Sequence, residues 1–254
     1  MKKLNRVFSH PLAFLKRRGK MRRRKSKWVI LTAVGAAMIL FGCAGQKRED
    51  ITMQEQNDFS EIQREMERYL ITKYGRIPYK ITGIIWRFWN QQYDQMNFQT
   101  EMDGRKEMCW VRRYEENDQI FFSDSYFGLC IRQEYENKMQ KNAELVFPKA
   151  KVVSFLNETE FSQAVEKTDD LKKAKKKGEK IRAVSWIIVT GIEEKELNEK
   201  AVQFQKIWQK EQMESLISVF LVEESYFLSF DRDDTETFIK DHRYQAQNIC
   251  YIPE

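Results

Sequence analysis

The stretch FQTEMDGRKEMCWVRRYEENDQIFFS, residues 98–123, decides the fold class of this chain. Within it, residues 108–114 (MCWVRRY) follow the two-residue period of a β-strand. Asp103-Gly104 before that strand is a strong signal for a two-residue hairpin turn, and Glu116-Asn117-Asp118 after it predicts a second turn. The stretch therefore predicts an antiparallel meander of strands.

Further helix and strand patterns surround this meander. Asp58 is a suitable N-cap for an amphipathic helix that runs to about Tyr74. The run at 84–89 (IIWRFW) is apolar on both faces, which predicts a central strand. After the meander, the pattern predicts helices at 125–145, 157–165, 193–213 and 233–242, and strands at 151–156, 183–192, 215–222, 226–230 and, as an edge strand, 248–252.

Helices interspersed with hairpins in this order predict an α+β fold, not a doubly wound parallel sheet. We expect antiparallel sheets with packed amphipathic helices, organised as one large unit or two small ones. The expected boundaries are a first unit at 58–147 (helix, meander, helix) and a second at 148–254. The polar, aperiodic segment at 43–57 is interpreted as a tether that precedes both units.

The N-terminal 42 residues have the pattern of an export signal. Five Arg and Lys residues within 22–27 precede the uncharged, apolar run from Trp28 to Gly42. The run ends in Leu40-Phe41-Gly42-Cys43, where small residues surround the expected cleavage point. Met21 would begin a signal of ordinary length, so residues 1–20 are interpreted as an upstream extension of the reading frame.

This pattern resembles the signal peptide of bacterial lipoproteins. The resemblance implies that the Cys43 thiol receives a diacylglycerol and that the chain is cut before it, which would leave the protein lipid-anchored at the outer face of the cytoplasmic membrane. Phe41 is bulkier than the residue usual at its position. Two alternatives stay open: an uncleaved transmembrane anchor, because residues 28–46 carry no charge, and an ordinary signal peptide with a chance cysteine.

The charge of the chain changes sign once this leader is set aside. The whole sequence has a formal net charge of +6. Twelve of its 44 Lys and Arg residues lie in residues 1–42, which contain no Asp or Glu, so the remainder has 32 basic against 38 acidic residues and a net charge of −6. We therefore predict no nucleic-acid partner, because phosphate backbones need a clustered positive surface.

Residues 44–254 show no pattern typical of a catalytic or metal site. His242 is the only histidine there, and no nucleophile-elbow sequence accompanies it. The acidic cluster from Asp231 to Glu236 lacks the glycine of an EF-hand loop. Cys109, Cys130 and Cys250 have no metal-ligand spacing and are interpreted as buried small hydrophobes, although one disulfide is possible. No cofactor, metal or catalytic residue is predicted.

Two candidate binding surfaces emerge instead. Trp89, followed by Gln91, Gln92 and Tyr93, is the best candidate for an exposed aromatic surface, against the alternative that the aromatic residues fill the core. A run of five lysines is a candidate contact for anionic lipid or wall polymer, against the alternative of a solvated helix end: Lys172, Lys173, Lys175, Lys176 and Lys177.

The sequence thus favours a non-catalytic binding or accessory module of the cell envelope, with an envelope protein or cell-wall polymer as partner. The alternative is an envelope hydrolase whose carboxylates are dispersed in sequence and meet only in the fold.

Overall fold

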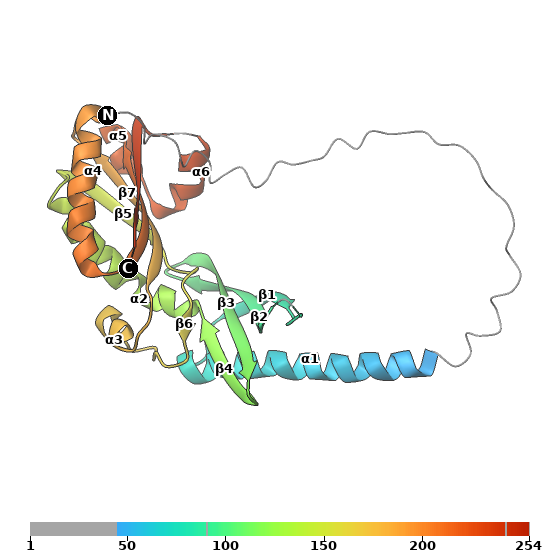
Figure 1. Ribbon diagram of the computed structural model, residues 1–254. Helices are drawn as coiled ribbons and strands as arrows, with labels where there is room; N and C mark the ends of the chain where they lie inside the picture. Colours follow the sequence, from blue (N-terminus) through green and yellow to red (C-terminus); the bar gives the residue numbers. More distant parts are fainter. Residues whose placement is uncertain (1–44, 90, 242, 254) are drawn as a thin grey trace, which may run out of the picture. The chain divides into compact units, whose positions relative to one another are not determined.

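The computed structural model describes residues 45–89, 91–241 and 243–253 (Figure 1). Residues 51–254 form one compact unit. Its two sheets and their helices confirm the predicted α+β class. In chain order the elements are α1 (Gly45–Tyr74), β1 (Tyr79–Ile85), β2 (Tyr93–Met102), β3 (Arg105–Glu116), β4 (Gln119–Asp124), α2 (Tyr126–Glu144), β5 (Lys149–Phe155), β6 (Phe161–Ser162), α3 (Leu171–Lys176), β7 (Arg182–Thr190), α4 (Glu194–Trp208), η2 (Gln209–Glu211), β8 (Glu214–Leu221), α5 (Glu224–Ser229), η3 (Arg232–Asp234), α6 (Thr235–Lys240) and β9 (Ala246–Ile252).

The first sheet is the predicted meander. Its strand order is β1-β2-β3-β4-β6, and all neighbours are antiparallel. In the β2–β3 turn Asp103 and Gly104 have φ values of 55° and 77°, and in the β3–β4 turn Asn117 and Asp118 have 51° and 61°. Positive φ at both central residues is the type I′ requirement that Asn, Asp and Gly meet most easily.

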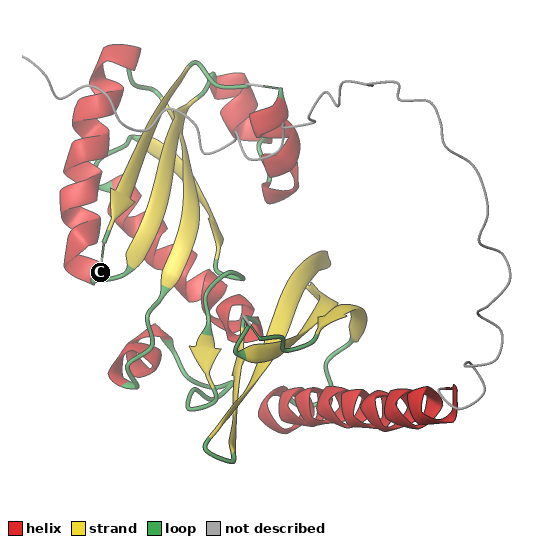
Figure 2. Cartoon of the chain, turned by 45° about the vertical axis from the view of Figure 1, so that its right-hand side comes forward, coloured by secondary structure: helices red, strands yellow, loops and turns green. Residues whose placement is uncertain are grey.

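The second sheet has the order β5-β7-β8-β9, in which only β7 and β8 are parallel. Helix α4 makes the crossover between these two strands, and β9 lies at the sheet edge as predicted. Helices α2 and α4 cover one face of the sheet, while α5 and α6 cover part of the other (Figure 2). Strand β7 is apolar on both faces because Ile187 packs beneath the first pair of helices and Ile188 beneath the second.

One hydrophobic core runs from α1 through both sheets to β9. Leu70 on α1, Phe98 on β2, Phe127 on α2 and Trp208 on α4 are all fully buried in it. A smaller aromatic cluster around Phe238 lies between the second sheet and α5–α6. Strand β6 lies beyond the predicted boundary at residue 147 but pairs with β4 of the first sheet. The first sheet therefore contains residues from both predicted units.

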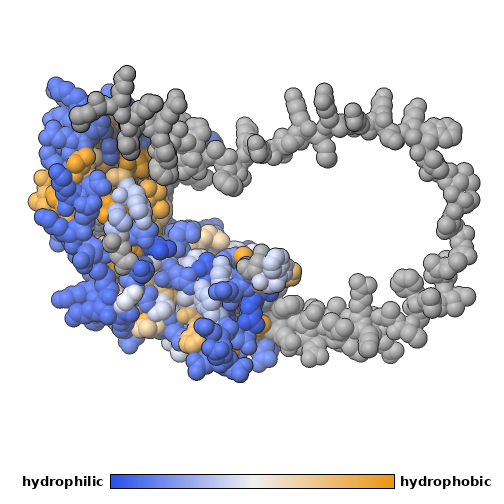
Figure 3. All heavy atoms as spheres, in the orientation of Figure 1, coloured by the Kyte–Doolittle hydropathy of each residue, from blue (hydrophilic) through white to orange (hydrophobic). Residues whose placement is uncertain are grey.

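The described residues leave part of the second sheet uncovered. Phe155, Val184, Leu216 and Tyr251 are cross-strand neighbours in a row across all four strands. Leu216 and Tyr251 are 42% and 55% exposed. In Figure 3 hydrophobic surface gathers over the part of the molecule that contains this sheet, whereas the surface of the first sheet is mostly hydrophilic.

Three predicted elements are wrong. The apolar run at 84–89 is not a central strand: β1 ends at Ile85 and lies at the sheet edge. Residues 157–165 form β6 and turns instead of a helix, because Phe161 is buried edge-on against Phe127 and pairing with β4 holds the segment extended. Residues 226–229 belong to α5 instead of a strand, since Phe227 in the helix and Phe230 directly after it both pack into the small aromatic cluster.

The segment predicted as an aperiodic tether is helical from Gly45 onward. No Pro or Gly interrupts residues 46–74, and Gln, Lys, Arg and Glu are good helix formers. Residues 1–42 and Cys43 lie outside the described residues. None of the helices within the described ranges combines the length and apolar character needed to cross a bilayer.

Candidate functional site

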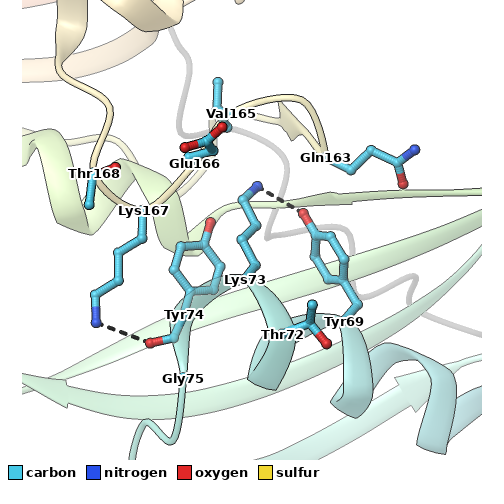
Figure 4. Close-up of a pocket in the computed structure, with 10 residues that line it drawn as sticks. All are labelled: Tyr69, Thr72, Lys73, Tyr74, Gly75, Gln163, Val165, Glu166, Lys167 and Thr168. Carbon is cyan, nitrogen blue, oxygen red and sulfur yellow. Dashed lines mark hydrogen bonds between the residues drawn. The ribbon is translucent and has the colours of Figure 1, made fainter.

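A cavity of about 760 Å³ lies beside the C-terminal end of α1 (Figure 4). One wall is the last turn of the helix, where Tyr69, Lys73 and Tyr74 project from α1. The other wall is the loop after β6, residues 163–168. We call this space the α1 cavity.

A buried charge cluster lies behind the α1 cavity. Asp124, at the end of β4, is fully buried, and its carboxylate lies 2.8 Å from the Lys73 ammonium. Tyr69 and Tyr74 donate hydroxyl hydrogen bonds of 2.6 and 2.7 Å to its two oxygens, and the backbone N–H of Phe127 donates a fourth bond of 3.0 Å. Four donors satisfy the carboxylate, as burial of a charge requires.

The local sequence explains this geometry. Tyr69 and Lys73 lie four residues apart, which places them on neighbouring positions of one helix face, and Tyr74 follows one residue further round the helix. Asp124 ends a strand and accepts the N–H of Phe127 in the first turn of α2, in the manner of an N-cap. None of these residues was predicted from the sequence as part of a site. The available signal was Asp124, which stands between a strand and a helix.

Each donor of the cluster has an acceptor within the fold. The Lys73 ammonium donates to Asp124, to the hydroxyl of Tyr69 and to the carbonyl of Ser162, so each of its three protons has an acceptor. Burial and the neighbouring Asp124 charge raise the pKa of Tyr69 and of Tyr74 well above the ordinary range, so both hydroxyls stay protonated donors. The arrangement holds α1 against β4 and α2, and it presents a mainly structural wall to the cavity.

Lys167 closes the other side of the α1 cavity by donating a 3.0 Å hydrogen bond to the Tyr74 carbonyl at the end of α1 (Figure 4). Gly75 then leaves the helix with φ of 77°, a left-handed conformation that glycine adopts without strain. The open rim of the cavity carries Thr72, Gln163 and Thr168. Such a rim can accept a side chain or small polar group.

A second cavity, of about 460 Å³, lies on the first sheet and contains the predicted residue Tyr93. We call it the Arg112 cavity. Its lining comes from the β1–β2 turn, β2, β3 and the segment before β6: Gln91, Gln92, Tyr93, Arg112, Tyr114 and Glu160. The guanidinium carbon of Arg112 lies 4.3 Å from the Tyr93 ring centroid and 4.1 Å from that of Trp110.

Glu160 joins the segment before β6 to strands β3 and β4 at this cavity. It accepts hydrogen bonds from Ser123 on β4, from Tyr114 on β3, and from Arg112 at 2.7 Å. Burial opposes ionisation of Glu160, but the bonds from Ser123 and Tyr114 and the Arg112 charge outweigh it and lower the pKa of this carboxyl. Glu160 is therefore an ionised acceptor near neutral pH.

The predicted aromatic residue Trp89 is 87% exposed and lies in the β1–β2 turn, two residues before Gln91. Phe88, at 66% exposed, is its ring neighbour with 6.2 Å between centroids. Trp110 is buried. Tyr93 therefore lines a cavity, whereas the side chain of Trp89, close to Tyr93 in the chain, is exposed to solvent.

The predicted lysine surface is only partly available. Lys175 donates to the Glu211 carbonyl, and Lys177 pairs with Asp169 at 2.6 Å. Lys172, Lys173 and Lys176 are exposed on the short helix α3. Two of the five lysines therefore stabilise their own unit.

The remaining predicted candidates have structural explanations or lie outside the described residues. His242 and Cys43 lie outside the described residues. Asp231 and Asp233 both pair with Arg105, at 2.9 and 2.6 Å. Across the described ranges, His, Cys, Asp and Glu form no group of three or more with metal-binding geometry.

Cys109, Cys130 and Cys250 are free thiols. Burial raises the pKa of Cys109 to about 12 and that of Cys130 and Cys250 to about 11, so these thiols are protonated at neutral pH. Cys109 is buried, as predicted from the sequence, whereas Cys130 and Cys250 are half-buried. Comparison with family models, curated proteins and solved structures found no match for this chain.

Proposed function

We propose that this chain is a lipoprotein, anchored through a diacylglycerol on Cys43 at the outer face of the cytoplasmic membrane. We propose further that its folded unit is a non-catalytic binding module of the cell envelope. The single observation that carries the anchor is the sequence from Arg22 to Cys43, in which a basic segment, an uncharged apolar run and small residues succeed one another.

Binding is favoured over hydrolysis by the surroundings of the carboxyl groups at the two cavities. A hydrolase with two carboxyl groups needs one whose pKa is raised, so that it can act as a general acid. At the Arg112 cavity the pKa of Glu160 is lowered. The pKa values of three carboxyl groups outside this cavity are lowered as well: Glu115, Asp169 and Asp231. At the α1 cavity, Lys73 and Asp124 already satisfy each other.

Metabolic labelling with a fatty acid tests the anchor. Cells that express the full chain are expected to incorporate label into it, and the Cys43→Ala variant is expected to lose the label and to accumulate with its leader uncleaved. Cys130→Ala, which removes a thiol from the folded unit, is the matched control and should keep full label. Equal labelling of the wild type and the Cys43→Ala variant would exclude the lipoprotein.

The exposed lysines of α3 supply a second proposed contact with the membrane. We expect Lys172, Lys173 and Lys176 to add about 1 kcal/mol each near an anionic surface at low salt. Co-sedimentation of residues 45–254 with phosphatidylglycerol vesicles should fall when these three become Gln and when salt is raised. Replacing the partnered Lys175 and Lys177 instead should change it less. Binding that is insensitive to salt would remove the contact.

A further inference from the structure

We propose that the Arg112 cavity binds a neutral saccharide of the cell envelope. This inference deepens the proposed binding function and rests on it, since it names the ligand class of one site. It is carried by three features of the cavity: a pre-oriented guanidinium, a balanced charge, and polar groups beside an exposed aromatic side chain.

The Arg112 guanidinium is held before any ligand arrives. It lies within 4.3 Å of the ring centroids of Tyr93 and Trp110, and such cation–π contacts fix its plane. Its Nε donates to the Gln95 amide oxygen at 2.8 Å, and its Nη1 donates to Glu160 at 2.7 Å. The Tyr114 hydroxyl is a further hydrogen-bond partner of the guanidinium, and this network fixes the direction in which the Arg112 N–H groups face the cavity.

The charge of the cavity favours a neutral ligand over an anion. Glu160 is ionised and contacts Arg112 directly, and so the pair has no net charge. An incoming phosphate or carboxylate would meet the Glu160 charge as closely as that of Arg112. A hydroxyl group both donates and accepts, and thus it can bond the guanidinium and the carboxylate at the same time.

Amide and hydroxyl groups complete the polar lining. The Gln91 side chain donates to the Tyr93 carbonyl at 2.9 Å, which leaves its amide oxygen as an acceptor. The exposed Gln92 amide supplies further donors and an acceptor. A few convergent groups of both kinds beside aromatic side chains are the usual composition of a site for a polar organic ligand.

Trp89 adds an apolar surface in the turn that leads into the cavity lining. The backbone N–H of Gln91 donates to the Phe88 carbonyl at 2.7 Å, which ties this turn to the start of the cavity lining. The C–H face of a pyranose ring can cover an exposed indole and remove apolar area from water. An indole that is 87% exposed gains from such a cover.

A ligand-detected NMR titration tests the site. The full chain is studied in a polyoxyethylene detergent, which has no sugar headgroup, with tetra-N-acetylchitotetraose, cellotetraose and maltotetraose as probes. We expect at least one probe to bind, and Trp89→Ala and Gln92→Ala each to weaken it about tenfold, the loss of roughly one good contact. Leu228→Ala, at a residue 70% exposed near the second sheet, is the matched control and should bind as the wild type does.

Charge separates the saccharide from an anionic wall polymer. The variant in which Lys172, Lys173 and Lys176 are replaced by Gln removes the proposed anion contact on α3. Poly(glycerol phosphate) should not bind this variant, whereas adding Glu160→Gln should give it affinity for the polymer because the Arg112 charge is then unopposed. The proposal is overturned if no saccharide probe binds, if Trp89→Ala and Gln92→Ala both bind normally, or if the lysine variant prefers poly(glycerol phosphate). None of these outcomes changes the fatty-acid label on Cys43, so the anchor is judged independently.

Discussion

The ammonium group of Lys73 lies 2.8 Å from a carboxylate oxygen of Asp124, although 51 residues separate the two in the chain. Only 7% of the Lys73 side chain and none of the Asp124 side chain is exposed. The pair joins the end of α1 to the junction of β4 and α2, which makes it a tie between the long helix and the first sheet.

Asp124→Asn is expected to destabilise the protein by about 3–5 kcal/mol, because it leaves the Lys73 charge buried without a counterion. Urea unfolding followed by circular dichroism measures the change. Asp241→Asn breaks the exposed pair with Arg243 and should cost less than about 1 kcal/mol.

The double variant Lys73→Met/Asp124→Asn should be more stable than the sum of its single variants predicts, since neither buried charge then remains. Additive effects would show that the two side chains do not interact in the folded protein.

Gly128→Ala in α2 is expected to destabilise the protein by about 1–3 kcal/mol. A Cβ at this position would lie 2.6 Å from the Leu156 carbonyl oxygen, and backbone atoms cannot move aside cheaply. Gly83→Ala is the control, because its nearest contact would be 4.0 Å away. Similar thermal midpoints for the two variants would contradict the close approach of α2 and the segment after β5.

Ser215→Ala is expected to cost about 1–3 kcal/mol, more than Ser218→Ala on the opposite face of β8. The Ser215 hydroxyl shares a 2.8 Å hydrogen bond with Tyr135 and accepts one of 3.0 Å from the Trp208 indole. Its loss leaves two buried groups without this partner. Chemical denaturation of both variants compares the costs, and equal values would count against the network.

The three thiols predict a decline in stability at alkaline pH. Burial raises the pKa of Cys109 to about 12 and of Cys130 and Cys250 to about 11, from 9.0. The folded chain therefore keeps protons that the unfolded chain releases, so the stabilisation is present below about pH 9 and is lost as pH rises toward 11–12.

The urea midpoint should accordingly be lower at pH 10 than at pH 8. Replacing all three cysteines with Ala should reduce the difference between the two midpoints. If the midpoint falls by the same amount in that variant, titratable groups other than the three thiols cause the decline.

Local patterns were enough for much of the fold. The two I′ turns at Asp103-Gly104 and Asn117-Asp118 depend on residues that tolerate positive φ, and these residues are visible in the sequence. The segment at 226–230 was misassigned because its apolar residues suit either a strand or a packed turn of helix, and contacts with the aromatic cluster around Phe238 decided for the helix. The segment at 84–89 was misassigned because its apolar side chains are not all buried: β1 ends at Ile85, and Phe88 and Trp89 are exposed in the turn that follows.

The residues of the Arg112 cavity, too, were only partly predictable from local sequence patterns. Tyr93 was identified from its aromatic surroundings, but Arg112 and Glu160 were not, because they come from segments 48 residues apart. No local period links such residues, and only the return of the chain at β6 beside β4 brings them together.

The sequence by itself determined the α+β class, the meander with its turns, and the lipoprotein-like pattern that ends at Cys43, because each depends on residues adjacent along the chain. The tertiary structure alone decided that Lys73 meets Asp124 and that Arg112 meets Glu160. Buried charges need partners from whatever element lies beside them, and that neighbour is set by the packing of the sheets and helices.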